Sequence, residues 1–219
     1  MLNVPNRKVL LYDEHNDPSV GDYVEFYLNY RGPLRATQRD PKEGSNIKAA
    51  HWQLKHAMRK GFHRQLKQQW SVTPFLQDSA NTQKPYQVDL LAKEFQLPPW
   101  RFVPLVTGRL QLVTGIDILL QRLDNASSSV WSGDIDNRIK TIIDALEVPR
   151  SNDGYAELTP DSHEDPFFCL LENDRYLNHV AVETANLLDA PDGADMSYAD
   201  VRIKVRIRPD NLIWDNIGF

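Results

Sequence analysis

The sequence predicts an α+β fold in which a mixed β-sheet packs against two main helices. Apolar and polar residues alternate over residues 24–30 and 201–207, as in half-buried strands. Apolar residues recur at helical spacing over residues 45–70 and again over 139–146. Because 41% of the 219 residues are apolar, we expect one domain, residues 1–219, with a sizeable core.

Charge and cysteine content exclude several classes of protein. The net charge of −5 argues against a protein that coats nucleic acid by bulk electrostatics. The single cysteine, Cys169, excludes an intrachain disulfide and a multi-cysteine zinc site, and we expect it to be a small buried hydrophobic residue. No apolar run is long enough to span a membrane, and residues 1–6 do not resemble a signal peptide. We therefore expect a cytoplasmic protein.

The first part of the chain predicts strands at residues 8–12 and 24–30, followed by a polar loop over residues 34–44. A long helix then begins at Ser45 and continues to Trp70. Its basic residues are Lys48, Lys55, Arg59, Lys60, Arg64 and Lys67. Because no acidic residue separates them, we expect a DNA-binding face, although such a face is often only solubilising. We expect His51, His56 and His63 to be phosphate-contacting or surface residues, because their spacing does not suit a metal site.

Two further regions look like insertions into a compact core. Residues 71–100 contain several prolines around a short helix at 88–95, and residues 150–166 form an acidic loop. The acidic loop has the composition of a solvated insertion, which we favour over a second metal site. Between and after them we expect strands at 102–107, 110–120, 167–171 and 179–184, with the last two hinged at Asp174. The closing strand, 201–207, has one apolar face and one cationic face, which either binds DNA or only faces solvent.

The stretch from Gly133 to Leu146 is the most informative part of the sequence. Ile139, Ile142, Ile143 and Leu146 have the spacing of one apolar helix face. Asp136, Lys140 and Asp144, at i, i+4 and i+8, share a neighbouring face, and we expect Asp134 to join them from an extended lead-in. Asp136 or Asn137 would cap the helix and Pro149 would end it.

These residue types admit two interpretations. An aspartate at the start of a helix and an Asp–Lys pair one turn apart are common on ordinary surface helices. One cap, however, needs only one carboxylate. Two carboxylates in an Asp-x-Asp sequence suit Mg²⁺, which takes one or two protein carboxylates together with water and phosphate oxygens. Such a site needs another carboxylate from elsewhere in the chain.

Residues 133–146, G-D-I-D-N-R-I-K-T-I-I-D-A-L, resemble the signature of RusA-type Holliday-junction resolvases, D-x-D-N-x-x-K-x-x-x-D-A-L. Residues 171–177, L-E-N-D-R-Y-L, resemble the downstream turn of that family, which usually has two consecutive aspartates. Here the first position is Asn173 and the second is Asp174, so an accessory carboxylate is missing from the pattern.

The resemblance implies a RusA-like fold and a homodimer that cuts four-way DNA junctions by paired phosphodiester hydrolysis. Asp134, Asp136 and Asp174 would hold Mg²⁺, with Mn²⁺ as a substitute, and Lys140 would contact the scissile phosphate. Asn137 would cap the helix or hydrogen-bond a ligand, and Asp144 would orient Lys140. Further phosphate contacts are expected from the loop after the first strand, through Arg35 and Arg39.

Two other functions fit the same sequence. One is a non-catalytic DNA-binding accessory protein of recombination, which would use the basic helix without the carboxylates. The other is a Mg²⁺-dependent phosphohydrolase acting on small phosphates, which suits the acidic pI of about 5.7 and does not need the basic helix. The salt dependence of DNA binding separates them, because phosphate contacts release counterions.

Overall fold

The computed structural model describes residues 24–35, 45–73, 87–123, 131–150, 155, 158–213 and 216. For residues 45–51 and 131–134 it describes the helical backbone without the side chains. The strand predicted at 8–12 lies outside these residues.

The described residues form an α+β fold, which confirms the predicted class. In chain order the elements are β1 (Val24–Pro33), α1 (Ser45–Val72), α2 (Gln87–Glu94), β2 (Gln96–Leu97), β3 (Trp100–Val106), β4 (Leu112–Arg122), α3 (Trp131–Leu146), β5 (Phe167–Leu171), the 3₁₀ turn η3 (Asp174–Tyr176), β6 (Leu177–Asn186) and β7 (Tyr198–Pro209). The strands belong to two sheets rather than to the single mixed sheet that we predicted.

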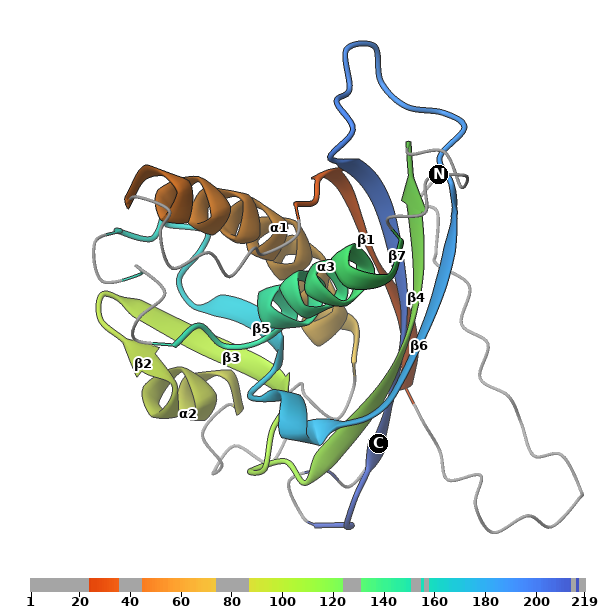
Figure 1. The fold of residues 1–219 in the computed structure, drawn as a ribbon. Helices are drawn as coiled ribbons and strands as arrows, with labels where there is room; N and C mark the ends of the chain where they lie inside the picture. The colour runs from red at the N-terminus through yellow and green to blue at the C-terminus, as the bar shows by residue number, and fades with distance from the viewer. Residues whose placement is uncertain are drawn as a thin grey trace, which may run out of the picture.

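The larger sheet has the order β1-β7-β4-β6. Strand β7 is antiparallel to β1 and β4, whereas β4 and β6 are parallel. Alternate residues of β4 and β7, such as Ile116, Ile118, Val201 and Ile203, are fully buried, as their alternation predicts. Figure 1 shows α1 and α3 on this apolar face of the sheet.

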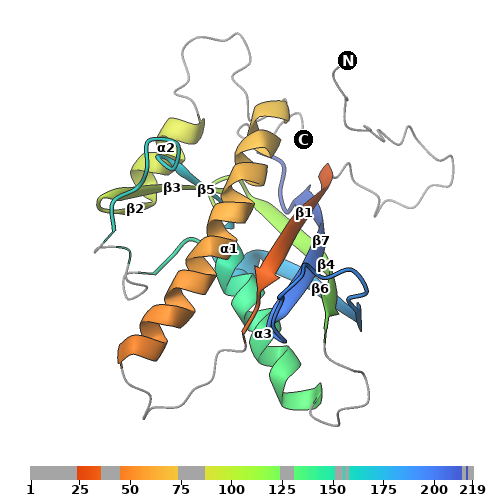
Figure 2. The same ribbon diagram turned by 90° about the horizontal axis from the view of Figure 1, so that it is seen from above.

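The smaller sheet has the order β2-β3-β5, with β3 and β5 parallel. Figures 1 and 2 show it on the opposite side of α1 and α3 from the larger sheet. One core joins both sheets to the helices and includes Phe62 of α1, Ile142 of α3, Leu170 of β5 and Val205 of β7. The two main helices therefore pack against sheet residues on both sides.

A second, aromatic core contradicts the expectation that residues 150–166 are a solvated insertion. Tyr155 is fully buried, and it packs with Trp100, Phe102 and Phe167. Its hydroxyl lies 2.9 Å from Nδ1 of His56 on α1. Residues 71–100 also contribute to the interior, since Leu91 of α2 is fully buried in the main core. Both regions thus supply core residues that bind the small sheet to α1.

The outer face of the larger sheet is polar, and its charges are largely paired. Arg206 of β7 donates two hydrogen bonds of 2.7 Å to Asp117 of β4. Lys204 pairs with Glu25 at 2.9 Å. The cationic face predicted for the closing strand is therefore present, but acids of neighbouring strands neutralise part of it. Among the described residues, no helix is long and apolar enough to cross a membrane.

Candidate functional site

Helix α3 has the two faces that the sequence predicts. Its apolar residues, Ile139, Ile142, Ile143 and Leu146, are buried in the main core or pack against it. On the polar face, Asp136 and Lys140 are exposed and Asp144 is half-buried. The helix ends at Leu146, three residues before Pro149.

The start of α3 differs from the prediction. The helix begins at Trp131, so Asp134 and Asp136 both lie within it, and no extended lead-in precedes Asp136. Asn137 lies in the helix interior, where its carbonyl accepts a 2.9 Å hydrogen bond from Thr141 Oγ1. Neither Asp136 nor Asn137 is therefore the N-cap. The side chain of Asp134 lies outside the described residues, so its role as a metal ligand stays a prediction.

The turn after β5 places Asp174 at the surface. Asn173 is the N-cap of η3, where its Oδ1 accepts a 3.1 Å hydrogen bond from the N–H of Arg175. Glu172 fixes the same turn from the other side, because its Oε2 accepts a hydrogen bond from the N–H of Gly108 at 2.9 Å. Asparagine at position 173 thus has a structural role in this turn, and Asp174 is left exposed.

The two sequence blocks that carry the family resemblance meet in space. Glu147, which follows α3, forms a parallel bridge with Leu171, the last residue of β5. The N–H of Val148 donates a 2.9 Å hydrogen bond to the carbonyl of Leu171. Because Asp174 follows Leu171 after a short turn, it lies close to the C-terminal end of α3.

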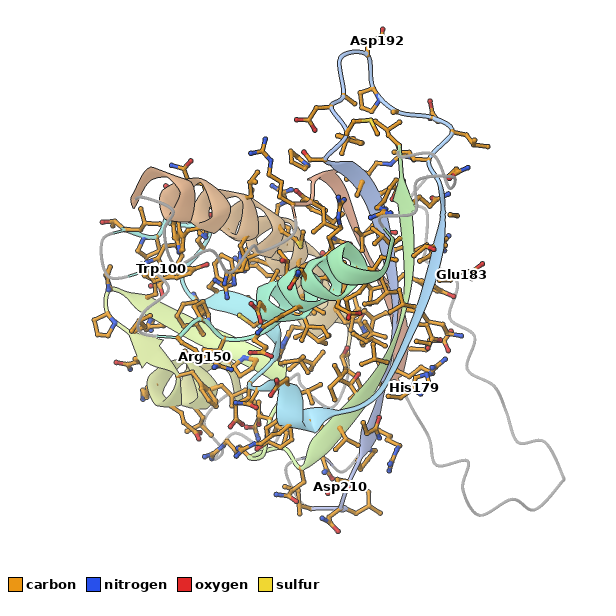
Figure 3. All side chains as sticks on the ribbon, viewed as in Figure 1. Trp100, Arg150, His179, Glu183, Asp192 and Asp210 are labelled. Carbon is orange, nitrogen blue, oxygen red and sulfur yellow. The ribbon has the colours of Figure 1, made fainter. Side chains whose placement is uncertain are left out.

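Glu147 is the titratable group most affected by this arrangement. It is 5% exposed, and burial raises the pKa of its carboxyl to about 7, with further increases from the carboxylates of Asp174 and Asp144. Arg150, labelled in Figure 3, lies 3.7 Å from Glu147 and opposes this shift. The carboxylates of Asp144 and Asp174 therefore both act on the buried carboxyl of Glu147 at this end of α3.

The predicted ligand Asp136 lies nearer the N-terminal end of α3. It is separated from Asp144 by eight positions, or about 12 Å along the axis. At the C-terminal end of α3, Asp144 and Asp174 thus act on Glu147. Asp136 and Lys140 lie nearer the start of the helix, on its polar face.

Asp144 is held by α1. Its Oδ2 lies 3.8 Å from Nζ of Lys55, and its backbone carbonyl accepts a 2.8 Å hydrogen bond from Arg59 Nη2. The charged partner of Asp144 in the described structure is therefore Lys55, whereas we predicted that Asp144 orients Lys140. These contacts fix the end of α3 against α1.

Several of the basic residues that we predicted to form a DNA-binding face on α1 are engaged within the chain. Arg59 is 2% exposed, so its guanidinium is not available to DNA. Lys60 pairs with the buried Glu164 at 2.7 Å, and Lys67 donates a 3.1 Å hydrogen bond to the carbonyl of His163. These cations are engaged because the fold brings carboxylates and carbonyl groups from distant parts of the sequence next to α1. Arg64 and Lys67 remain exposed.

The remaining predicted phosphate contacts are only partly described. Arg35 is exposed and lies 3.9 Å from Asp195. Arg39 and the side chain of Lys48 lie outside the described residues, so their contact with DNA stays a prediction.

The prediction of surface or phosphate-contacting histidines is wrong for His63, which is 2% exposed. Its Nδ1 accepts a 2.8 Å hydrogen bond from the N–H of Phe168, so its Nε2 donates to the carbonyl of His163 at 3.1 Å. Burial lowers the pKa of His63 to about 4. Burial likewise lowers the pKa of His56 to about 4, so both rings are neutral at physiological pH.

Asp161, His163 and Glu164 are the one group of potential metal ligands that the described residues bring within 4.8 Å of one another. Lys60 already neutralises this group, because its ammonium lies 2.7 Å from Glu164 and 3.9 Å from Asp161. The group therefore anchors the acidic loop to α1, and it does not make a convincing cation site.

No protein-family model, curated protein sequence or solved structure matches this chain.

Glu147 was not among the site residues that we predicted from the sequence. No local pattern marks it, because the helix ends at Leu146 and Glu147 meets Asp174 only through the bridge between Glu147 and Leu171.

Proposed function

We propose that the protein is a metal-dependent endodeoxyribonuclease that acts as a cytoplasmic homodimer and resolves four-way DNA junctions by paired phosphodiester hydrolysis. The observation that carries this proposal is the junction of α3 with the turn after β5. It brings residues 133–146 and 171–177, the two blocks that resemble RusA-type resolvases, against one another through Glu147 and Leu171.

Two described carboxylates at this junction are of the type that a hard divalent cation takes, although the described residues bring no third potential ligand within 4.8 Å of both. Asp174 and Glu147 offer carboxylate oxygens, which Mg²⁺ and Mn²⁺ prefer. Burial is the main cause of the raised pKa of Glu147, and the carboxylates of Asp174 and Asp144 add to it, so a cation at this place would favour the charged carboxylate. The resemblance implies Asp134, Asp136 and Asp174 as metal ligands, but Asp136 lies about 12 Å along α3 from Asp144, whereas Asp174 and Glu147 lie at the end of that helix, so the variants below must decide between a cation at either position.

A bound divalent cation would supply Lewis acidity, which lowers the pKa of a bound water and stabilises charge on the scissile phosphate. Lys140, exposed on the polar face of α3, would contact that phosphate as a point charge. Asp144, held by Lys55 and Arg59, would fix the orientation of α3 beneath the substrate.

The test is cleavage of a labelled four-way junction and of a linear duplex, with Mg²⁺ and with a chelator. Wild type, Asp136→Asn, Asp174→Asn and Glu147→Gln should be compared with Asp192→Asn, a control in an exposed loop (Figure 3). We expect Mg²⁺-dependent cutting confined to the junction, with losses of orders of magnitude for Asp136→Asn and Asp174→Asn and unchanged cutting by the control.

The same set of variants locates the metal along α3. If Asp174→Asn and Glu147→Gln abolish cutting while Asp136→Asn cuts normally, the cation lies at the end of α3 and the ligand set taken from the resemblance is wrong. If none of the preparations cuts DNA in Mg²⁺, the nuclease proposal fails.

The contacts that basic residues of α1 make within the chain favour the phosphohydrolase alternative. Lys55, Arg59 and Lys60 face other parts of the same chain, so less of α1 is available to a DNA backbone. Phosphate release from small phosphoesters, without salt-sensitive DNA binding, would support this alternative. Steeply salt-dependent junction binding without cleavage would instead support the accessory protein.

A further inference from the structure

Strand β6 is an edge strand of the larger sheet as the described residues form it. Its pairing with β4 is regular from His179 to Asn186, after an irregularity at Asn178. Among the described residues no strand pairs with its other side, and Figure 1 shows no helix or strand beyond it. The free edge thus presents backbone N–H and C=O groups that favour pairing with another strand.

The opposite edge of the sheet is protected. Gln65 of α1 accepts a 2.9 Å hydrogen bond from the N–H of Asn29 and donates one of 2.8 Å to its carbonyl. In β6 we find no comparable side-chain cap among the described residues. The sequence of β6 also lacks proline, lysine and arginine, which commonly prevent pairing at edges.

The centre of β6 is complementary to itself. It has the sequence His179-Val180-Ala181-Val182-Glu183. In an antiparallel pair of two copies centred on Ala181, His179 lies opposite the partner's Glu183, and Val180 lies opposite the partner's Val182. Twofold symmetry makes each of these pairs twice.

We propose that β6 pairs with β6 of a second copy of this chain, antiparallel and centred on Ala181, so that two four-stranded sheets become one continuous sheet. The proposal names an interface for the homodimer of the proposed function, on which it builds. The interface itself is argued from β6 alone.

Both faces of β6 support this register. On the outer face, His179 lies beside Gly115 and Glu183 beside Leu119, and Nε2 of His179 is 3.2 Å from Asp117. Figure 3 shows both labelled side chains on the side of β6 away from α3. The paired copy would place a carboxylate next to each exposed imidazole, where the ring can donate a hydrogen bond to it across the strands.

On the inner face, two apolar side chains lack cover. Val180 and Val182 are 43% and 40% exposed, although their neighbours on β4, Ile116 and Ile118, are buried. A second β6 would put valine against valine on this face and continue the apolar surface of the sheet from one copy into the other.

The first test is the molar mass in solution, measured by light scattering over a range of concentrations. We expect twice 25.2 kDa for the wild type. Val180→Lys/Val182→Lys should be monomeric, because like charges face one another. Val180→Lys/Val182→Glu should be more dimeric than the double lysine variant, because lysine then faces glutamate in the proposed register.

A monomeric wild type, or equal behaviour of the two double variants, would overturn the proposal. Both substituted positions are partly exposed, and circular dichroism of each variant checks that it is folded. Because mass is measured without substrate or metal, loss of the dimer and loss of cleavage are separate results.

The second test determines the register by cross-linking. In Ala181→Cys the two introduced thiols lie opposite one another, at a Cβ separation of about 5 Å, and should form an intermolecular disulfide. In Ala185→Cys, also on β6, the two thiols would be about 27 Å apart, and no cross-link is expected. The native Cys169 is buried and does not compete. Equal cross-linking of both variants, or of neither, would refute the register.

Discussion

Replacing His63 with glutamine should remove part of the acid sensitivity of this fold. The folded state lowers the pKa of His63 from 6.5 to about 4, so between these values it binds fewer protons than the unfolded chain. Stability contributed by neutral His63 is therefore complete above pH 6.5 and is lost as the pH falls towards 4. Protonation would also remove the acceptor that the N–H of Phe168 needs.

The magnitude follows from the size of the shift. Lowering the pKa of His63 from 6.5 to about 4 reduces the free energy of unfolding by about 3.4 kcal/mol at the acid limit. At pH 5 the reduction is about 2 kcal/mol. Glutamine cannot titrate, and it retains an amide that can donate to the carbonyl of His163. It should cost about 1–3 kcal/mol at pH 7, because one of the two imidazole hydrogen bonds is lost.

The assay is urea unfolding of wild type and His63→Gln between pH 4.5 and 7.5. The free-energy difference between the two proteins should shrink by about 2 kcal/mol as the pH falls from 7 to 5. The matched control is His163→Gln, because its side chain is exposed and the carbonyl that accepts hydrogen bonds from His63 and Lys67 belongs to its backbone. A constant difference for His63→Gln across this pH range would show that the burial argument is wrong.

Two other predictions use the same measurements. Burial and neighbouring carboxylates raise the pKa of Glu147 from 4.5 to about 7, so its favourable contribution is present below 4.5 and is lost as the pH rises through 7. Relative to wild type, Glu147→Gln should therefore gain about 2.5 kcal/mol of stability between pH 5 and pH 8, and an unchanged difference would contradict this assignment. Arg59→Ala should lower stability by about 2–4 kcal/mol, because a buried charged hydrogen bond and its packing are lost. The exposed Arg64→Ala should change stability by about 0.5 kcal/mol or less, and equal losses for both would refute the buried role of Arg59.

Periodicity predicted the elements well because it depends on neighbours along the chain. The apolar faces of α1 and α3, and the alternation of β1 and β7, follow from burial of one side of each element. Boundaries were less predictable. Asp136 looks like a helix cap in the sequence, yet α3 begins at Trp131, so the Asp-x-Asp pair lies within the helix. No local signal at Asp136 distinguishes an N-cap from an exposed helical aspartate.

The candidate site was harder to predict, because its charges are set by contacts between distant residues. Glu147 and Asp174 interact only because β5 returns alongside the end of α3. Tyr155 is in a polar, acidic stretch, yet it is buried by aromatic residues from β3 and β5. Composition alone assigned this stretch to solvent, because composition does not show which of its residues enters a core.

Contacts between residues distant in sequence also change the DNA binding expected of α1. Counting charges along α1 gives six potential phosphate contacts, but Lys55, Arg59 and Lys60 are engaged within the chain. Each phosphate contact contributes about −0.9 to the slope of log binding constant against log salt concentration. The structure therefore predicts a slope for junction binding that is shallower by about 2.7 per chain than the charge count predicts. Fluorescence anisotropy with a labelled junction at several salt concentrations measures this slope. The full slope would mean that these three cations leave their partners when DNA binds, so that α1 separates from the end of α3.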